Sequence, residues 1–397
     1  MLKEIRLFFK NKCNLYLAFF LLYYVLTNFF RPFFLTTIVM YGLMSVSFYH
    51  FIYANLNFKL SRFFKALTIL VFIFLFYGLL LALSDVRLFV REGEWRPVDN
   101  FLYIKQITTR LLPFYSFYVY AKKGVLTEQN IKIWTPIFCL YVIALFVNHA
   151  HYLSEIDVLG NGSTNNFAYS FVSLIPIGLF VSQKKYTKLL FLWGCLIFIL
   201  LSGKRGAIVC GLCSLVIFFF FQIKEFSFKK VFGILFGVAI SVLLLSYTYN
   251  WVIDSNLYFQ SRIGKLRTGD IGHRSELYTT FINHFLNDDV FHQLFGNGAN
   301  ATLIISNNYA HNDWLEILIN QGVLGVIIYL FYFSSFFKEL ISVSPKYKMV
   351  ALVIFSSCFL RSVFSMGYRQ YDIFLIMLIV FLLARQSNGK EVILSHE

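Results

Sequence analysis

Charged residues are scarce in this chain. Asp, Glu, Lys and Arg make up 14% of its 397 residues, whereas 58% are hydrophobic. A soluble domain carries roughly 25% charged residues, so this composition excludes one. The apolar residues come in runs of about 15 to 21, roughly the length a helix needs to cross a hydrocarbon core of about 30 Å. Barrel strands are shorter and alternate, so we predict an all-α polytopic membrane protein.

The sequence also lacks a metal or nucleotide motif. All six cysteines lie in or beside apolar runs, and the CxxC of Cys210 and Cys213 has no second pair. Such a lone pair in an apolar run does not predict a zinc or redox site. The triplet Gly296-Asn297-Gly298 lacks the strand and helix of a nucleotide loop and is interpreted as a turn. We therefore expect no metal and no cofactor.

No small-residue cleavage site follows the first apolar run, Asn14 to Phe30, so we interpret it as a transmembrane helix and not as a signal peptide. In all we predict about twelve spans. They are approximately 14–30, 33–53, 64–83, 101–120, 134–148, 166–181, 188–201, 206–221, 231–250, 315–337, 349–366 and 368–384. Residues 1–250 thus hold nine spans, 251–314 a long polar loop, and 315–397 three spans and a tail.

The formal net charge is +15. In a soluble protein this charge would suggest a nucleic-acid partner, but here most basic residues lie in short loops between spans. With the amino terminus in the cytoplasm, most Lys and Arg fall on the inner side, as the positive-inside rule expects. Both termini are then cytoplasmic, the polar loop faces outward, and no nucleic-acid partner is predicted.

The long outer loop has helical periodicity. Leu277, Phe281, Phe285 and Leu286 recur at spacings that line one helix face, and Gly296-Asn297-Gly298 then breaks the chain. We expect two short helices on the outer membrane surface over a central cavity. A purely structural cap is the alternative.

His311 stands at the start of the next apolar helix. Asn312 or Asp313 is placed to cap this helix, and Asp313 and Glu316 suit the positive end of its dipole. Gly322 predicts a bend or a close helix contact. A histidine at a helix amino terminus favours its neutral form, which a general base needs. A histidine that only caps or packs is the alternative.

Two arginines stand at turns that we place on the outer side. Arg205 follows Lys204 in a very short glycine-flanked connection, where the alternative is snorkelling at a helix end. Arg274 opens the first loop helix, a position that favours anions and that a guanidinium turns into a forked phosphate site. A plain surface arginine would fit this position equally well.

Further cations fall within the spans. Arg110 lies near the middle of the 101–120 run, and intramembrane arginines usually face a polar cavity. Lys105, Arg361 and Arg369 lie towards the outer ends of their spans. Together these four cations are expected to line an outward-facing pocket for an anion. The alternative is a set of separate ion pairs with acids such as Asp85, Glu276 and Asp372.

These features resemble the bacterial O-antigen polymerase and O-antigen ligase superfamily. The resemblance is carried by the number of spans, the late outer loop, Arg205-Gly206 after a short turn, Arg274 followed by Tyr278, Gly296-Asn297-Gly298, and His311-Asn312-x-x-Leu315-Glu316 with Gly322 and Gly325. It is specific from about Leu201 to Leu330. Lys204 and Tyr278 depart from the residues usual in the family, and neither removes a matched functional position.

The resemblance implies a metal-independent glycosyltransferase of the GT-C type in the bacterial inner membrane, acting at the periplasmic face on glycans linked to undecaprenyl diphosphate. It assigns Arg205 and Arg274 to the donor diphosphate and His311 to the catalytic centre. The remaining expected substrate contacts are Lys105, Arg110, Lys204, Tyr278, Asn312, Arg361 and Arg369. Membrane lipids and a chain-length regulator protein are the other expected partners.

Within the superfamily, the compact length and the Phe-, Ile- and Asn-rich composition favour a polymerase over a ligase that transfers the glycan to lipid A core. A transporter or flippase of lipid-linked sugars is a third candidate. Transporters usually have paired halves with interrupted helices. This chain has one late, unpaired loop, which favours an enzyme.

Overall fold

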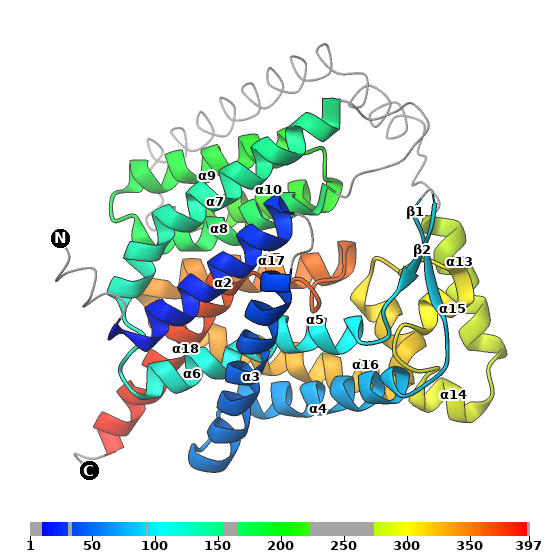
Figure 1. The fold of residues 1–397 in the computed structure, drawn as a ribbon. Helices are drawn as coiled ribbons and strands as arrows, with labels where there is room; N and C mark the ends of the chain where they lie inside the picture. The colour runs from blue at the N-terminus through cyan, green and yellow to red at the C-terminus, as the bar shows by residue number, and fades with distance from the viewer. Residues whose placement is uncertain (1–9, 31–33, 93, 155–164, 223–273, 395–397) are drawn as a thin grey trace.

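The computed structural model describes residues 10–30, 34–92, 94–154, 165–222 and 274–394, most of them helical (Figure 1). The helices are α2 (Lys12–Phe29), α3 (Phe34–Asn57), α4 (Arg62–Ala82), α5 (Leu102–Arg110), α6 (Pro113–Lys122), α7 (Glu128–Ser154), α8 (Ala168–Val181), α9 (Lys185–Leu201), α10 (Arg205–Gln222), α13 (Arg274–Asn287), α14 (Val290–Phe295), α15 (Ala301–Ser306), α16 (Asp313–Ile341), α17 (Lys348–Phe364) and α18 (Ile373–Leu394). Strands β1 (Leu88–Glu92) and β2 (Glu94–Val98) pair as an antiparallel hairpin.

Several helices have the length and apolarity of membrane spans. In the described part of the chain, 6 segments meet both requirements: 34–57, 62–82, 128–149, 205–222, 313–341 and 345–364. Ala168–Val181 and Ile373–Arg385 are shorter apolar helices. An all-α membrane protein is thereby supported, while about twelve spans and a GT-C fold stay predictions. The expected span 231–250 lies outside the described residues.

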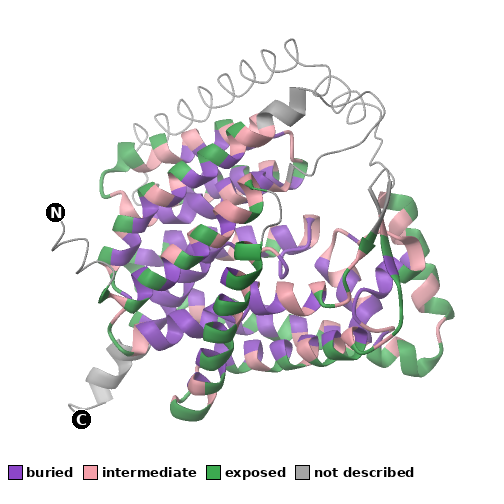
Figure 2. Ribbon diagram, in the orientation of Figure 1, coloured by how far each residue is buried: buried purple, intermediate pink, exposed green. Residues whose placement is uncertain are grey.

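Exposed apolar side chains mark the faces that would contact lipid. Phe34 on α3 is 76% exposed, and α4 exposes Phe72 and Phe76 by more than half. Figure 2 shows α3 as a largely exposed helix at the edge of the bundle. Apolar surface of this extent marks an interaction with protein or membrane, and its position on long apolar helices favours lipid.

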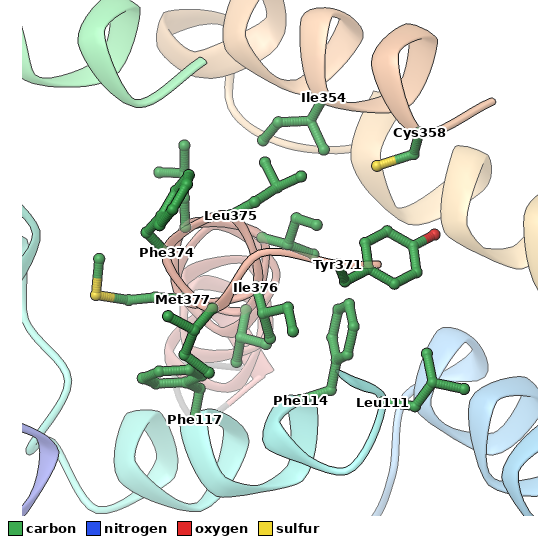
Figure 3. Packing of buried hydrophobic residues seen from close by; sticks show 14 of the residues in the cluster. Leu111, Phe114, Phe117, Ile354, Cys358, Tyr371, Phe374, Leu375, Ile376 and Met377 are labelled. Atoms are coloured by element: carbon green, nitrogen blue, oxygen red, sulfur yellow. The ribbon is translucent and has the colours of Figure 1, made fainter. Parts of the chain in front are cut away.

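The centre of the bundle is α18. Every residue from Ile373 to Ala384 is buried, so this part of the helix is apolar and covered on all sides. Its side chains pack against Phe117 of α6 and Ile354 of α17, while Tyr371, just before α18, lies near Phe114 and Cys358 (Figure 3). This core fixes the short segment that precedes α18 and contributes polar residues to the site.

The predicted span 101–120 is wrong as a single helix. It divides into α5 and α6, and Pro113 is the first residue of α6. Proline has no amide hydrogen and clashes with the preceding turn, so it starts a helix readily and interrupts one. Arg110 therefore lies at the end of a helix of 9 residues and not in the middle of a long one.

The loop 84–100 contains the β-hairpin, which the all-α prediction missed. Figure 1 shows the hairpin and α13 to α15 at one end of the bundle, with the start of α2 and the end of α18 at the other. We call α13, α14 and α15 the cap. Both ends of the described chain thus lie on the side opposite the cap.

The cap buries most of its predicted apolar face. Phe281 of α13 is fully buried with Ala301, Ala310 and Ile319, and Leu277 and Phe285 pack against this cluster. Leu286, which was expected on the same face, is 64% exposed. The described loop holds three short helices where two were predicted.

Gly322 interrupts α16 and joins it to the cap. It has φ 67° and ψ −167°, and a Cβ there would collide with the backbone of Leu294. The turn formed by Gly296, Asn297 and Gly298 docks at this break: Asn297 N donates to Ile319 O and Gly298 N to Asn320 O, both at 2.9 Å. The predicted bend and close contact at Gly322 are both confirmed.

Candidate functional site

His311 lies in the connection from α15 to α16, in a left-handed backbone conformation with φ 53°. Two side chains fix this connection. Asn312 Oδ1 accepts from Leu315 N at 3.1 Å and caps α16, and Glu316 Oε2 accepts from Ala310 N at 2.8 Å. The helix start predicted at Asn312 or Asp313 is therefore confirmed. A left-handed non-glycine residue held in this way is typical of functional positions.

The surroundings of His311 keep its imidazole neutral. Burial, and then the positive charges of Arg274 and Lys204, lower its pKa from 6.5 to about 4. Arg274 is the first residue of α13, and Lys204 belongs to the turn between α9 and α10. Three elements far apart in sequence thus bring two cations close to one histidine.

Arg205 is the first residue of α10 and directly follows Lys204, one of the two cations near His311. Arg274 Nη1 donates to Phe364 O at 3.5 Å. A Cβ at Gly206 would lie 2.7 Å from Cβ of Phe364 and would collide with the hydroxyl of Tyr169. Because Gly206 fits closely against Phe364 and Tyr169, the amino terminus of α10 approaches the residue that Arg274 contacts. Arg205 itself is exposed.

Arg369 occupies a buried network. Its Nη2 lies 3.1 Å from Glu316 Oε1, its Nη1 donates to Asn300 Oδ1 at 2.9 Å and its Nε donates to Tyr368 Oη at 2.8 Å. The guanidinium also lies over the ring of Tyr103, 4.8 Å from the centroid. Its side chain is 1% exposed, so this geometry favours a structural role over substrate contact.

Asp313 is the neighbouring buried acid. Its Oδ2 accepts from Tyr329 Oη at 2.6 Å and from Tyr368 N at 3.1 Å. Trp314 Nε1 donates to Ser362 Oγ at 3.1 Å. The start of α16 is thereby attached to the connection between α17 and α18.

Arg110 and Arg361 line one cavity of about 240 Å³, together with Asp372. Lys105 lies apart from it in an ion pair with Asp99 at 2.6 Å. The four cations expected in one pocket therefore divide: two share a cavity, and Lys105 and Arg369 form separate pairs. Arg361 also pairs with Asp372 at 3.5 Å, which is one of the pairings named as the alternative.

The other predicted contacts take different positions. Tyr278 is half-buried on α13, one turn after Arg274, and Lys204 is half-buried beside the glycine turn.

Among the described residues, no group of three or more His, Cys, Asp or Glu side chains is placed to hold a metal ion. The absence of a metal requirement stays a prediction.

Sequence reasoning missed Tyr169 and Gln370 entirely. Tyr169 stands between Gly206 and the guanidinium of Arg361, which lies 4.7 Å from its ring centroid. Gln370 Oε1 accepts from Arg361 Nη2 at 3.3 Å. Nothing in the sequence singles out one tyrosine among 25, but Gln370 belongs to the run Arg369 to Asp372, whose polar residues at the start of the predicted span 368–384 were a usable signal.

Fold and site together describe a multi-helix membrane protein with a histidine and several cations gathered where the helices meet a cap. Comparison with known families adds a more specific finding. Residues 190–330 match the family described as O-antigen ligase, and this segment contains Arg205, Arg274 and His311. The match supports a place for the chain in the O-antigen ligase and polymerase superfamily. A search of curated proteins found no match.

Proposed function

We propose that this protein is an inner-membrane glycosyltransferase that extends a lipid-linked surface glycan at the periplasmic face. It transfers the glycan from undecaprenyl diphosphate to a hydroxyl of another lipid-linked repeat unit. The convergence of Arg274 and Lys204 on His311, inside the segment that matches the family, carries the proposal.

The chemistry needs only what these residues provide. A polyprenyl diphosphate is already a good leaving group, so the enzyme must supply positive charge where negative charge develops and a base for the acceptor hydroxyl. Arg205, Arg274 and Lys204 supply the charge. His311 takes the hydroxyl proton while the acceptor oxygen bonds to the anomeric carbon and the bond from that carbon to the diphosphate breaks.

The donor itself would make His311 a stronger base. In the free protein Arg274 and Lys204 oppose protonation of His311. A diphosphate bound at these cations offsets their charge, and an anion nearby favours the imidazolium form. The pKa of His311 then rises toward the operating pH, where a general base is most effective.

The test uses purified protein in lipid vesicles with a lipid-linked repeat unit. We expect wild-type protein to extend the unit. His311→Ala should lose at least about 100-fold in rate, the usual contribution of a positioned acid or base. Arg274→Ala should lose about 100-fold or more, as is typical when a group that stabilises developing negative charge is removed. His284→Ala is the matched control, because His284 lies on α13 of the same cap and pairs with Asp288 at 3.6 Å. A chelator should leave turnover unchanged. Full activity in His311→Ala would contradict the assignment of His311 as the general base.

A second candidate is the O-antigen ligase reaction, because the matched family carries that description. The donor and the site are the same, and the acceptor is lipid A core. The surface glycans of a deletion strain separate the two reactions. One repeat unit on the core indicates a lost polymerase, whereas a bare core with accumulated lipid-linked polymer indicates a lost ligase.

A further inference from the structure

The cavity of about 240 Å³ lies beside the proposed active site and is separate from it. It is lined by the carboxyl-terminal halves of α2 and α7, the end of α5, the start of α8 with the residues just before it, the last turn of α17 and the connection from α17 to α18. Tyr169 forms the partition. Its ring stacks on Arg361, which lines the cavity, and its hydroxyl faces Gly206 at the start of α10.

Positive charge predominates in the lining. Among the described lining residues, Arg110 and Arg361 share the cavity with one carboxylate, that of Asp372, and with the imidazole of His149. That carboxylate lies 3.5 Å from Arg361 Nη1 and also accepts from Ser173 Oγ at 2.7 Å. Arg110 Nη1 donates to two neutral oxygens, Tyr24 Oη at 2.9 Å and Tyr371 O at 3.2 Å. Two guanidinium groups against one carboxylate give the described part of the lining a net positive charge.

One donor is unused. Arg361 is 6% exposed, yet its Nε is buried without a hydrogen-bond partner among the described residues. Burying an unpaired donor or an uncompensated cation is costly, and charged residues at membrane depth usually mark a ligand path. An anionic ligand in the cavity would compensate the charge, whereas the Nε of Arg361 has no open surface and would gain no partner from such a ligand.

The rest of the lining suits a ring with many hydroxyl groups. Side-chain amides face the cavity from three elements, through Asn28, Asn166 and Gln370. Each amide both donates and accepts, as a hydroxyl does. Tyr141 and Phe167 add aromatic surface. Pockets that bind small molecules combine such apolar walls with a few placed polar groups.

We propose that this cavity is a subsite for one acidic sugar residue of the glycan substrate, of the uronic acid class. The carboxylate of that residue would meet the guanidinium groups of Arg110 and Arg361, and its hydroxyl groups would meet the amides. The identity of the ligand as part of a glycan rests on the proposed function. Binding itself is measurable without any glycosyl transfer.

The experiment is saturation-transfer NMR on the purified full-length protein, with glucuronate, glucose and inorganic phosphate as separate probes. We expect glucuronate to bind at least tenfold more tightly than glucose, and phosphate not to displace it. Arg110→Gln should weaken glucuronate binding at least tenfold, whereas Arg110→Lys should retain most of it. Lys105→Gln is the control, because Lys105 is on the same helix and pairs with Asp99 away from the cavity.

Asp372→Asn is a second, independent test, because this variant is expected to bind glucuronate more tightly than the wild-type protein. It removes the one carboxylate found among the described residues of the lining, so glucuronate should bind more tightly, an effect that misfolding cannot produce. Equal binding of glucose and glucuronate, displacement by phosphate, or no binding of glucuronate would each overturn the proposal. Each of these results leaves the transfer assay of His311→Ala unaffected, so failure here is distinct from failure of the proposed function.

Discussion

Replacing Glu316 by glutamine tests how the site is held. Oε1 accepts from Thr302 Oγ1 at 2.9 Å, Asn320 Nδ2 at 3.2 Å and Arg369 Nη2 at 3.1 Å, while Oε2 accepts from Ala310 N at 2.8 Å. A glutamine has one accepting oxygen. In either orientation its amide therefore points a donor at another donor, and Arg369 loses its counterion.

The expected loss of stability follows from these contacts. Breaking a buried ion pair by removing one partner costs about 3–5 kcal/mol, because the remaining charge stays buried. With an unfolding entropy of about 2.1 cal/mol/K per residue, a loss of about 4 kcal/mol lowers the melting temperature of a chain this long by about 5 °C. Activity should fall as well, because Glu316 fixes Ala310, the residue before His311.

The assay is thermal unfolding of the purified protein in detergent, followed by the fraction that remains monodisperse after heating. Arg369→Gln is measured in parallel and should lose comparable stability. Asp289→Asn is the control, because Asp289 is an exposed acid that pairs with His292 on the surface of the cap. If Glu316→Gln and Arg369→Gln melt like wild type while Arg369→Gln weakens donor binding, Arg369 is a substrate residue and the structural argument is refuted.

Other predictions concern His311 and two glycines. The pKa of His311 is about 4 in the free protein, so kcat/KM should stay level down to about pH 5. A bound diphosphate raises this pKa, so kcat should decline at a higher pH than kcat/KM as the pH is lowered. If kcat and kcat/KM fell at the same acidic pH, the prediction would be contradicted. Arg274→Gln should raise the pKa of His311, measured by NMR titration of the imidazole, because one opposing cation is lost; an unchanged titration would place Arg274 elsewhere. Gly322→Ala should destabilise the protein by about 2 kcal/mol or more, because its φ is 67° and the added Cβ collides with Leu294. Gly42→Ala in α3 is the control, because a Cβ at Gly42 meets nothing within 4 Å. It should be neutral or slightly stabilising in the same melting assay. Equal changes in melting temperature for Gly322→Ala and Gly42→Ala would argue against the break in α16.

Local signals predicted the parts of the structure that depend on local physics. Apolar run length indicated the membrane helices, and the polar pair Asn312 and Asp313 marked the start of α16. Gly322 was predicted to bend or approach another element, and it does both. Pro113 was also visible in the sequence as a signal for a helix start, but the prediction of one span over 101–120 rested on the length of the apolar run alone.

Pairings between distant residues were beyond the reach of sequence patterns. Glu316 was expected to stabilise a helix dipole, yet its main partner Arg369 lies 53 positions away. Arg110 and Arg361 were predicted to share a cavity, and they do, but nothing local distinguished them from Arg369 and Lys105, which form ion pairs elsewhere. Which cation faces a cavity depends on how helices pack, and a single sequence carries little information about that packing.

The docking of the Gly296 to Gly298 turn on α16 means that the shape of this membrane helix is encoded outside the helix. The carbonyl groups of Ile319 and Asn320 are those that residues 323 and 324 would reach in an uninterrupted helix, and here they accept from Asn297 and Gly298. The same carbonyls can therefore be satisfied in two ways, by a straight helix or by a broken one with the turn attached. Because the donors of the turn are backbone amides, few side-chain substitutions can remove them, and Gly298→Pro is the direct way to withdraw one. The break in this membrane helix is therefore stabilised by a segment that precedes the helix in the chain.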